Sequence, residues 1–294
     1  MTTMVDELAE CLDLRPDGDN RFVGSSLAEV GEGDVVFGGQ MAAQLLVAGS
    51  TVDPTKPVKS IQVLLGRAAV RHEPVEFVVE PMHGGRTFAS ATVTATQRGR
   101  LCSRALVLLS ASEPDLIHHA LEMPAADPPD RCPNWDAYTV GSERNWVAGR
   151  ELRVVGGVDT SDRDAVHDPR LLVWTRVRGL AGDPVKHQAY LAFATAGPNI
   201  GVAMLPHAGL GTVDAHETVS TGIMTHDVVF HEPADAEDWL LVVFESPSAG
   251  GGRSFGRGDI FTSGGRLVAS YTQSNMIRGF SSDPVGIGAA KTVL

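Results

Sequence analysis

Many side chains in this sequence carry reactive groups, but few of them lie in a pattern that is typical of a known chemistry. Its ten histidines lack the spacing of a metal site, and its three cysteines form no Cys-x-x-Cys pair. No Gly-x-Ser-x-Gly segment is present to place a nucleophilic serine on a sharp strand-to-helix turn. The Gly-rich segment 248–252 lacks the Lys of a phosphate-binding loop and is predicted to form a hairpin tip. The sequence therefore predicts neither a metal centre nor a serine-nucleophile hydrolase.

The chain contains an internal repeat, and its two copies differ in chemical character at Gln273. Three segments of the first half recur in the same order in the second: residues 78–80, 85–88 and 99–101 match 243–245, 252–255 and 265–267. When Leu267 is aligned with Leu101, Gln273 falls opposite Val107 of the first half. An amide side chain thus replaces an apolar one in one copy only, which is expected if a duplication left one copy to specialise.

Composition and charge exclude several classes of protein. The 294 residues are 43% hydrophobic and 20% charged, which is typical of a globular protein with a sizeable core. The formal net charge is −12, so the chain is a poor candidate for binding nucleic acid or an anionic membrane surface. No apolar run approaches the roughly 18 residues of a membrane helix. The acidic start does not read as a secretory signal, and we expect a cytoplasmic protein without disulfides.

The elements that must position Gln273 form two similar sets. In each half, an apolar helix is predicted beside strands that are separated by tight turns, which indicates antiparallel pairing. The helix of the first half is apolar nearly all round and is therefore expected to be buried. The predicted helices are 5–13, 38–49 and 187–196, and the main predicted strands are 21–27, 58–65, 75–81, 87–97, 100–110, 220–231, 239–246, 254–262 and 266–277.

This pattern predicts an α+β fold made of two tandem units, each an antiparallel sheet wrapped round a central helix, which is the hotdog architecture. We expect a first hotdog over residues 1–112 and a second over 150–280. The segment 113–149 is rich in Pro and Asp at its start and is predicted to be a linker. Residues 281–294 are predicted to be a loose tail.

Several segments resemble the acyl-CoA thioesterase II family of double-hotdog enzymes. They cover the start of the first hotdog and nearly the whole second one, namely 36–40, 226–233, 239–241, 254–262, 267–273 and 276–278. The resemblance implies hydrolysis of fatty acyl-CoA to free acid and CoA, a role in fatty acid metabolism, and no metal or organic cofactor. It also implies that the acyl chain lies beside the helix between the two hotdogs.

The same resemblance implies that an Asp, a Thr or Ser, and a Gln hold the attacking water. Gln273 falls on the Gln position, whereas Ala196 stands at the Asp position and Ile223 at the hydroxyl position. Thr225 follows Ile223 by two residues, so on a regular strand it would share a face with it and could supply the hydroxyl. His226 or Asp227 could act as the base, although only one face of that strand can look inward.

Two further groups are candidates for substrate binding. Gly38, Gly39 and Gln40 either bring a helix N-terminus to a ligand or form a turn where strand and helix pack closely. Arg257 has no counterpart in the first half and is a candidate contact for the CoA phosphates or for a partner subunit. Sheet edges left open by one double hotdog are compatible with a further homodimer.

Three functions remain open from the sequence. The first is hydrolysis of an acyl-CoA thioester by a positioned water. The second is binding of acyl-CoA or an acyl chain without catalysis, because two of the three expected positions are substituted. The third is a hotdog hydratase or dehydratase, which needs an Asp/His pair for which we find no equivalent. If Ala196, Ile223 and Gln273 lie far apart in the fold, the assignment of all three is wrong.

Overall fold

The structure is a computed structural model that describes residues 4–27, 35–135, 149–180 and 182–280. The predicted tail and part of the predicted linker lie outside these residues, so the domain boundaries stay a prediction. The elements of the first half are α1 (Met4–Leu12), β1 (Arg15–Pro16), β2 (Arg21–Gly24), α2 (Gly38–Ser50), β3 (Val58–Leu65), β4 (Val75–Gly84), β5 (Phe88–Gln97) and β6 (Arg100–Ser110).

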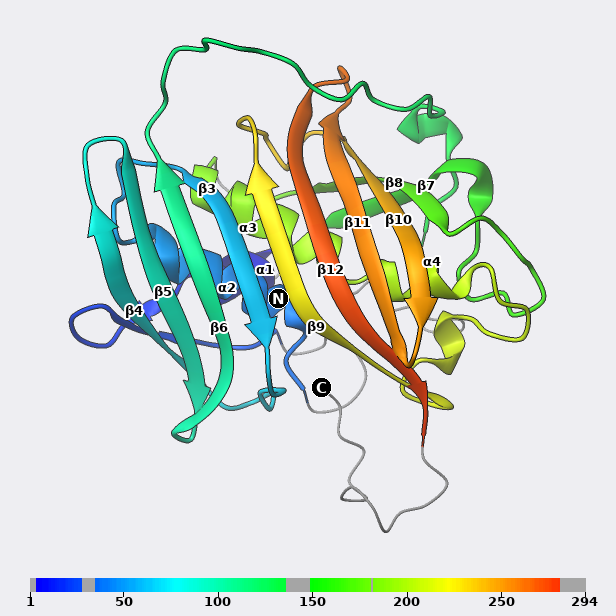
Figure 1. Cartoon of the computed structure of the whole chain (residues 1–294), viewed down its shortest axis with the longest axis horizontal. Helices are drawn as coiled ribbons and strands as arrows, with labels where there is room; N and C mark the ends of the chain where they lie inside the picture. Colours follow the sequence, from blue (N-terminus) through cyan, green and yellow to red (C-terminus); the bar gives the residue numbers. More distant parts are fainter. Residues whose placement is uncertain (1–3, 28–34, 136–148, 181, 281–294) are drawn as a thin grey trace.

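After β6, residues 111–128 form no helix or strand and pass over one end of the sheet (Figure 1). The strands and α-helices of the second half are β7 (Arg150–Val154), β8 (Arg170–Val177), α3 (Pro184–Ala196), α4 (Asn199–Met204), β9 (Val219–Phe230), β10 (Leu240–Gly250), β11 (Arg253–Thr262) and β12 (Leu267–Gly279). Short 3-10 helices lie at Pro129–Arg131, Val155–Gly157 and Thr212–Asp214. No helix of the described segments has the length and apolar character needed to cross a membrane.

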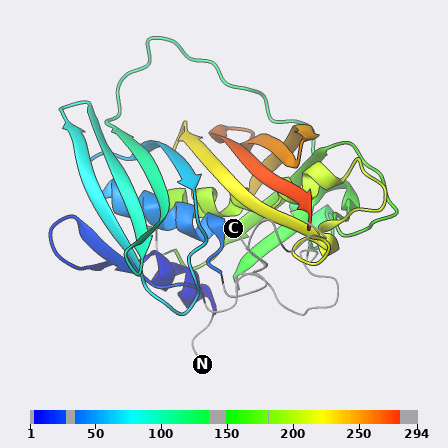
Figure 2. The same ribbon diagram turned by 60° about the horizontal axis from the view of Figure 1, so that its bottom comes forward.

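The strands form one continuous antiparallel sheet across both halves. Its order is β1-β2-β4-β5-β6-β3-β9-β12-β11-β10-β8-β7, so the halves meet where β3 pairs with β9. Around this junction the second half repeats the first, because β6-β3 on one side corresponds to β12-β9 on the other. The sequence predicted a sheet in each half but not the strand pairing that joins them. Figure 2 shows the sheet curving round the helices.

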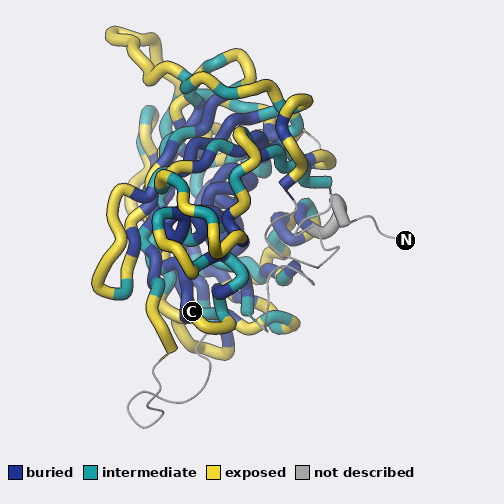
Figure 3. Tube along the Cα trace, turned by 90° about the vertical axis from the view of Figure 1, so that its right-hand side faces the viewer, coloured by how far each residue is buried: buried dark blue, intermediate teal, exposed yellow. Residues whose placement is uncertain are grey.

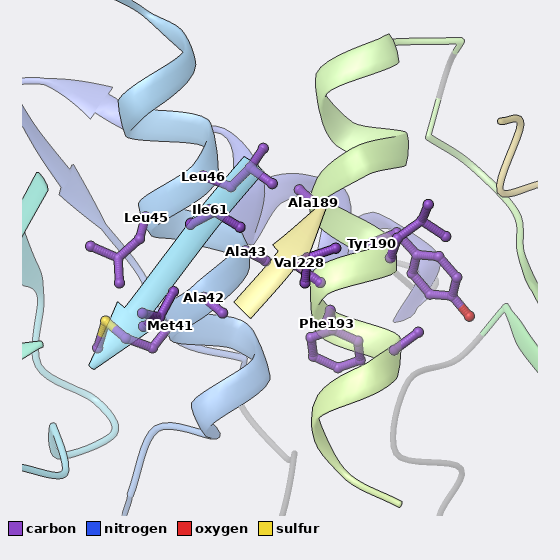
Figure 4. Packing of buried hydrophobic residues seen from close by; sticks show 14 of the residues in the cluster. Met41, Ala42, Ala43, Leu45, Leu46, Ile61, Ala189, Tyr190, Phe193 and Val228 are labelled. Carbon is purple, nitrogen blue, oxygen red and sulfur yellow. The ribbon is translucent and has the colours of Figure 1, made fainter. Parts of the chain in front are cut away.

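The two long helices lie side by side in the curve of the sheet and form the centre of the core (Figure 4). α2 is buried along nearly its whole length, as its all-round apolar sequence predicts. Between the helices and the sheet, Ile61 of β3 and Val228 of β9 are both completely buried. Each such aliphatic side chain contributes about 1.5–3 kcal/mol relative to an exposed one. The helices are therefore fixed against the strand pair at which the halves join, with the exposed residues gathered on the outside (Figure 3).

α3 begins earlier than predicted, and α4 was not predicted. α3 begins at Pro184 because Asp183 caps it, with its carboxylate accepting from the backbone N–H of Val185 at 2.9 Å. After Ala196 the chain makes a short break at Gly197 and Pro198 and then forms α4, which the sequence analysis did not predict. The break is consistent with Pro198, which has no backbone N–H to donate within a continuing helix.

Candidate active site

Gln273 lies on the inner face of β12, directly opposite His226 of β9. Both side chains are fully buried. The amide nitrogen of Gln273 donates a 2.6 Å hydrogen bond to Oδ1 of Asn275, two residues along the strand. Its Oε1 oxygen accepts no hydrogen bond from the described residues. A buried acceptor that lacks a donor costs about 1–3 kcal/mol, so this oxygen is a candidate contact for a ligand or a water.

The hydrogen bonds of His226 define which ring nitrogen carries the proton. Nε2 lies 3.1 Å from the carbonyl oxygen of Ala192 and 3.1 Å from Oγ1 of Thr195. A carbonyl oxygen only accepts, so Nε2 must be protonated and donate. In the neutral ring Nδ1 then carries the lone pair, and it contacts no donor among the described residues. The pKa of His226 is lowered to about 4, chiefly by burial, with smaller opposing effects of the Ala192 carbonyl and the Gln273 side chain.

Asn199, the first residue of α4, brings a third buried amide to the same place. Its nitrogen donates to the carbonyl oxygen of Thr195 at 2.9 Å, while its Oδ1 accepts no hydrogen bond from the described residues. Oδ1 lies against Gly256 of β11, at a point where an added Cβ would overlap it, and Gly256 pairs with Gln273. The absence of a side chain at Gly256 therefore makes room for Asn199 beside Gln273. We refer to Thr195, Asn199, His226, Gln273 and Asn275 as the polar cluster.

The polar cluster has an apolar counterpart in the first half. The strand pair that joins His226 and Gln273 corresponds to the pair that joins Ile61 and Val107. Leu109 takes the place of Asn275, and near the end of α2 Gly49 packs against Val107. The positions of the first half are closed and apolar, so the fold does not need polar groups there. Groups that are costly to bury and present in one copy only point to a functional site in the second half.

The positions that the resemblance assigned to the family Asp and hydroxyl lie at the edge of this cluster. A Cβ at Gly39 would lie 2.9 Å from the Cβ of Ala196, and one at Gly38 would lie 3.1 Å from Cδ1 of Ile223. Ala196 and Ile223 therefore pack under the first turn of α2. Ile223 also pairs with Asn275 across β9 and β12. The structure brings all of these residues together, but it places neither a carboxylate nor a hydroxyl at 196 or 223.

The structure corrects the expected orientation of Thr225. A β-bulge at Met224 makes Ile223 pair with Asn275 while Thr225 pairs with Ser274, so the regular alternation of faces is broken. His226 then points inward and Thr225 points to the outer face of the sheet. Thr225 therefore cannot supply a hydroxyl to the polar cluster. Asp227 also lies on the outer face, and burial raises the pKa of its carboxyl although hydrogen bonds from Val63 and Thr272 oppose this.

Two predicted binding residues lie away from the polar cluster. Gln40 is buried, but its Oε1 accepts from the backbone N–H of Leu27 at 3.1 Å and its nitrogen donates to the carbonyl of Ser25. These bonds tie α2 to the segment after β2. Arg257 lies on the outer face of β11, where its Nε donates to Glu245 at 3.2 Å. Neither side chain faces Gln273, and the contacts that both make are structural.

The patterns of the sequence did not single out Thr195, Asn199 and Asn275. One signal could have found Asn275, because it stands two residues after Gln273 and so shares its face on a strand. Thr195 and Asn199 are four residues apart, which would place them on one side of a helix. The sequence gives no comparable signal that α4 approaches β11 and β12, since that contact depends on the tertiary fold.

The fold defines a double-hotdog protein, with two units that share one continuous sheet. Sequence models of two domains match the chain: the acyl-CoA thioesterase N-terminal domain over residues 28–110 and the acyl-CoA thioesterase C-terminal domain over 126–277. The chain therefore belongs to the acyl-CoA thioesterase family. The predicted double-hotdog fold and the family resemblance are both confirmed.

Individual relatives agree with this assignment. The chain is 29% identical over 264 residues to acyl-coenzyme A thioesterase 8 of Mus musculus, covering 83% of this chain and 80% of that protein. It is 31% identical to the solved acyl-CoA thioesterase II TesB2 of Mycobacterium marinum, with a TM-score of 0.77 and coverage of 94% and 100%. A hot dog fold protein of Alicyclobacillus acidocaldarius matches at 23% identity, a TM-score of 0.74 and coverage of 95% and 99%, which supports the fold alone.

Proposed function

We propose that this protein hydrolyses acyl-CoA thioesters to a free acid and CoA, using water held at the polar cluster. The observation that carries the proposal is the set of acceptor atoms buried in the second half only. Oε1 of Gln273 and Oδ1 of Asn199 both lack a donor among the described residues; Oδ1 of Asn199 lies against Gly256, whose partner residue on β12 is Gln273. A water can donate one of its hydrogens to such an oxygen, which fixes the direction in which the water approaches a thioester carbon.

The first turn of α2 is placed to stabilise the thioester oxygen as negative charge develops on it. Its backbone N–H groups have no partner within the helix, and the positive end of the helix dipole lies there. Gly38 and Gly39 pack on Ile223 and Ala196, so this turn adjoins the polar cluster. Donors aimed at a developing oxyanion typically contribute roughly 10²–10³ in rate. The lack of a Cβ at both positions allows the close approach that this arrangement requires.

The proposal extends to the acyl chain, the setting and the assembly of the protein. We propose that an acyl chain lies along the apolar faces of α2 and α3, and that the enzyme serves fatty acid metabolism in the cytoplasm. We further propose a homodimer that covers exposed apolar side chains on the outer face of the sheet, among them Leu64, Leu106, Leu108 and Val229. The predicted hotdog boundaries, 1–112 and 150–280, are retained as part of this proposal.

One observation favours a second candidate function, which is binding of acyl-CoA without hydrolysis. Ala196 and Ile223 replace the carboxylate and the hydroxyl that the family uses to activate water. Loss of a general base typically lowers the rate by roughly 10²–10⁴. A chain with no substitute for the base would bind acyl-CoA but would hydrolyse it very slowly. This candidate predicts saturable acyl-CoA binding together with no turnover.

Thiol release from acyl-CoAs of graded chain length separates the two candidates. The proposed hydrolase releases CoA from at least one chain length, and Gln273→Ala lowers kcat by roughly 10²-fold. His231→Gln is the matched surface control, because its Nε2 contacts only Ser270 at 2.9 Å on the outside of the sheet. Binding without release by the wild type, followed by a gain of release in Ala196→Asp, would overturn the proposal in favour of the second candidate.

A further inference from the structure

We propose that Nδ1 of His226 is the proton acceptor that activates the hydrolytic water, in place of the carboxylate that is missing at Ala196. The inference rests on the proposed thioester hydrolysis and names the group that performs its proton transfer. It starts from three positions of this chain. Ala196 cannot accept a proton, Thr225 and Asp227 face outward, and His226 is the titratable side chain of β9 that points into the polar cluster.

The contacts of the ring leave the lone pair on Nδ1. Nε2 is held against α3 by the Ala192 carbonyl and the Thr195 hydroxyl, both at 3.1 Å. The Thr195 hydroxyl donates its own proton to the carbonyl of Leu191 at 2.8 Å, so toward His226 it acts as an acceptor. Both partners therefore require a proton on Nε2. This leaves the lone pair on Nδ1, on the side of the ring away from these two contacts.

The surroundings of His226 keep the ring neutral and therefore able to accept a proton. The side chains placed against it are Thr195 of α3 and Gln273 and Tyr271 of β12, none of which is charged at neutral pH. The Tyr271 hydroxyl is engaged as a donor to the carbonyl of Val243 at 3.1 Å. On β3, the residue paired with His226 is Val63, which is apolar. The pKa of His226, lowered by burial, agrees with a neutral imidazole throughout the physiological range.

A purely structural role for His226 is the alternative, and the internal repeat argues against it. The corresponding position of β3 holds Ile61, which is fully buried at the same place in the first half. The fold thus closes this position with an aliphatic side chain where no chemistry is performed. A buried imidazole with one nitrogen bonded and the other unpartnered is more costly than isoleucine, which indicates that Nδ1 serves the reaction.

The chemical step balances with water as the only co-reactant. Nδ1 takes a proton from the water while its oxygen forms a bond to the thioester carbon, and the carbonyl electrons move to the oxygen. Collapse of this tetrahedral intermediate breaks the C–S bond. The imidazolium returns the proton to the leaving sulfur, which gives the carboxylic acid and CoA thiol and restores neutral His226.

The test compares water with a nucleophile that does not need deprotonation. In His226→Gln, we expect CoA release by hydrolysis to fall at least roughly 10²-fold. Cleavage by added hydroxylamine, which forms a hydroxamate and CoA thiol, should stay within about threefold of the wild-type rate, because a neutral amine attacks without the base. His231→Gln serves as the surface control, with both rates unchanged.

Each failure has a distinct reading. If wild-type protein releases no CoA with either nucleophile, the proposed function is wrong. If the wild type hydrolyses and His226→Gln retains that rate, or loses both reactions equally while its Tm is unchanged, the role of His226 as the base is wrong. Should His226→Gln not fold, ¹⁵N NMR of histidine-labelled wild type decides, since a proton on Nδ1 instead of Nε2 overturns the inference.

Discussion

His226 and Gln273 face each other across β9 and β12 at the position where the first repeat pairs Ile61 with Val107. One strand pair thus appears twice in the chain, once with two apolar side chains and once with two polar ones. Both versions are fully buried or nearly so. The apolar pair shows that the fold does not require polar side chains at this position. The polar pair of the second half is therefore an addition to what the fold needs. The added groups form the site at which we place the chemistry.

Converting the polar pair on β12 into its first-repeat counterpart should remove activity but keep the fold. In Gln273→Val with Asn275→Leu, both partners of a buried hydrogen bond are replaced by the residues found at Val107 and Leu109. Replacing both partners of one hydrogen bond is nearly neutral, but the buried hydroxyl of Ser254 also loses its donor, Nδ2 of Asn275, so we expect the free energy of unfolding to fall by about 1–3 kcal/mol. Hydrolysis should fall at least roughly 10²-fold. Chemical denaturation and CoA release measure the two effects.

The single variant Gln273→Val is the control for this double change. It leaves Oδ1 of Asn275 without the donor that it has in the wild type. We therefore expect it to be less stable than the wild type by about 1–3 kcal/mol. A single variant that is as stable as the wild type would contradict the hydrogen bond described between the two amides.

Gly256→Ala tests whether Asn199 belongs to the site. The added Cβ would overlap the Asn199 amide, so that side chain must move away from Gln273. We expect a loss of roughly 10-fold or more in kcat, with a destabilisation of about 1–3 kcal/mol that is typical of overpacking. Gly264→Ala is the matched control, because its Cβ would meet only Thr262 Oγ1 at 3.8 Å. If Gly256→Ala has the kcat of the wild type, Asn199 does not belong to the catalytic site.

The packing of α2 on α3 gives a third prediction at Gly39. A Cβ there would lie 2.8 Å from the Phe193 carbonyl oxygen and 2.9 Å from the Cβ of Ala196, with backbone as one of the neighbours. Gly39→Ala should therefore push the first turn of α2 away from the site, with a cost of about 1–3 kcal/mol in stability. Because the same turn is proposed to bind the thioester oxygen, kcat should fall as well. Calorimetry and the thiol assay report these separately, and unchanged kcat would exclude α2 from oxyanion binding.

Burial of His226 makes the stability of the protein depend on pH. Its pKa is lowered from 6.5 to about 4 in the folded chain, so between these values the unfolded chain binds a proton that the folded chain does not. The stabilisation is therefore complete above pH 6.5 and is lost as the pH falls toward 4. Its size is on the order of 3 kcal/mol.

The difference between wild type and His226→Gln isolates this contribution from that of other titrating groups. We expect the unfolding free energy of the wild type to fall relative to that of His226→Gln as the pH is lowered from 7 to 4, as followed by denaturant unfolding at each pH. A difference that stays constant over this range would show that His226 is not buried as a neutral imidazole.

The sequence predicted the repeated elements well, because each depends on local pattern. β3 and β6 have the predicted bounds, and the apolar sequence of α2 implied its burial. The pairing of β3 with β9 was not predicted, since nothing in either strand specifies a partner in the other half. Two features of the site could not be predicted from the sequence for the same reason. The bulge at Met224 reverses the face of Thr225, and α4 brings Asn199 to β11 through tertiary contact alone.

For Gln273 and Ala196, the family resemblance predicted the location but only part of the chemistry. Gln273 belongs to the polar cluster and Ala196 lies beside it, but the carboxylate that the resemblance implies is absent at Ala196. We propose that His226 replaces this carboxylate. The sequence could not distinguish His226 from Asp227 as the base, because only the structure shows which of them lies on the inner face of β9.

The most direct test of the account compares one substitution at two repeat-related positions. We predict that wild-type protein releases CoA from a long-chain acyl-CoA, that Gln273→Ala loses at least roughly 10²-fold in kcat/KM, and that Val107→Ala stays within a few-fold of the wild type per folded molecule. This result would place catalysis in the second hotdog. Equal losses at both positions, or full activity of Gln273→Ala, would contradict the central claim that the polar cluster is the catalytic site.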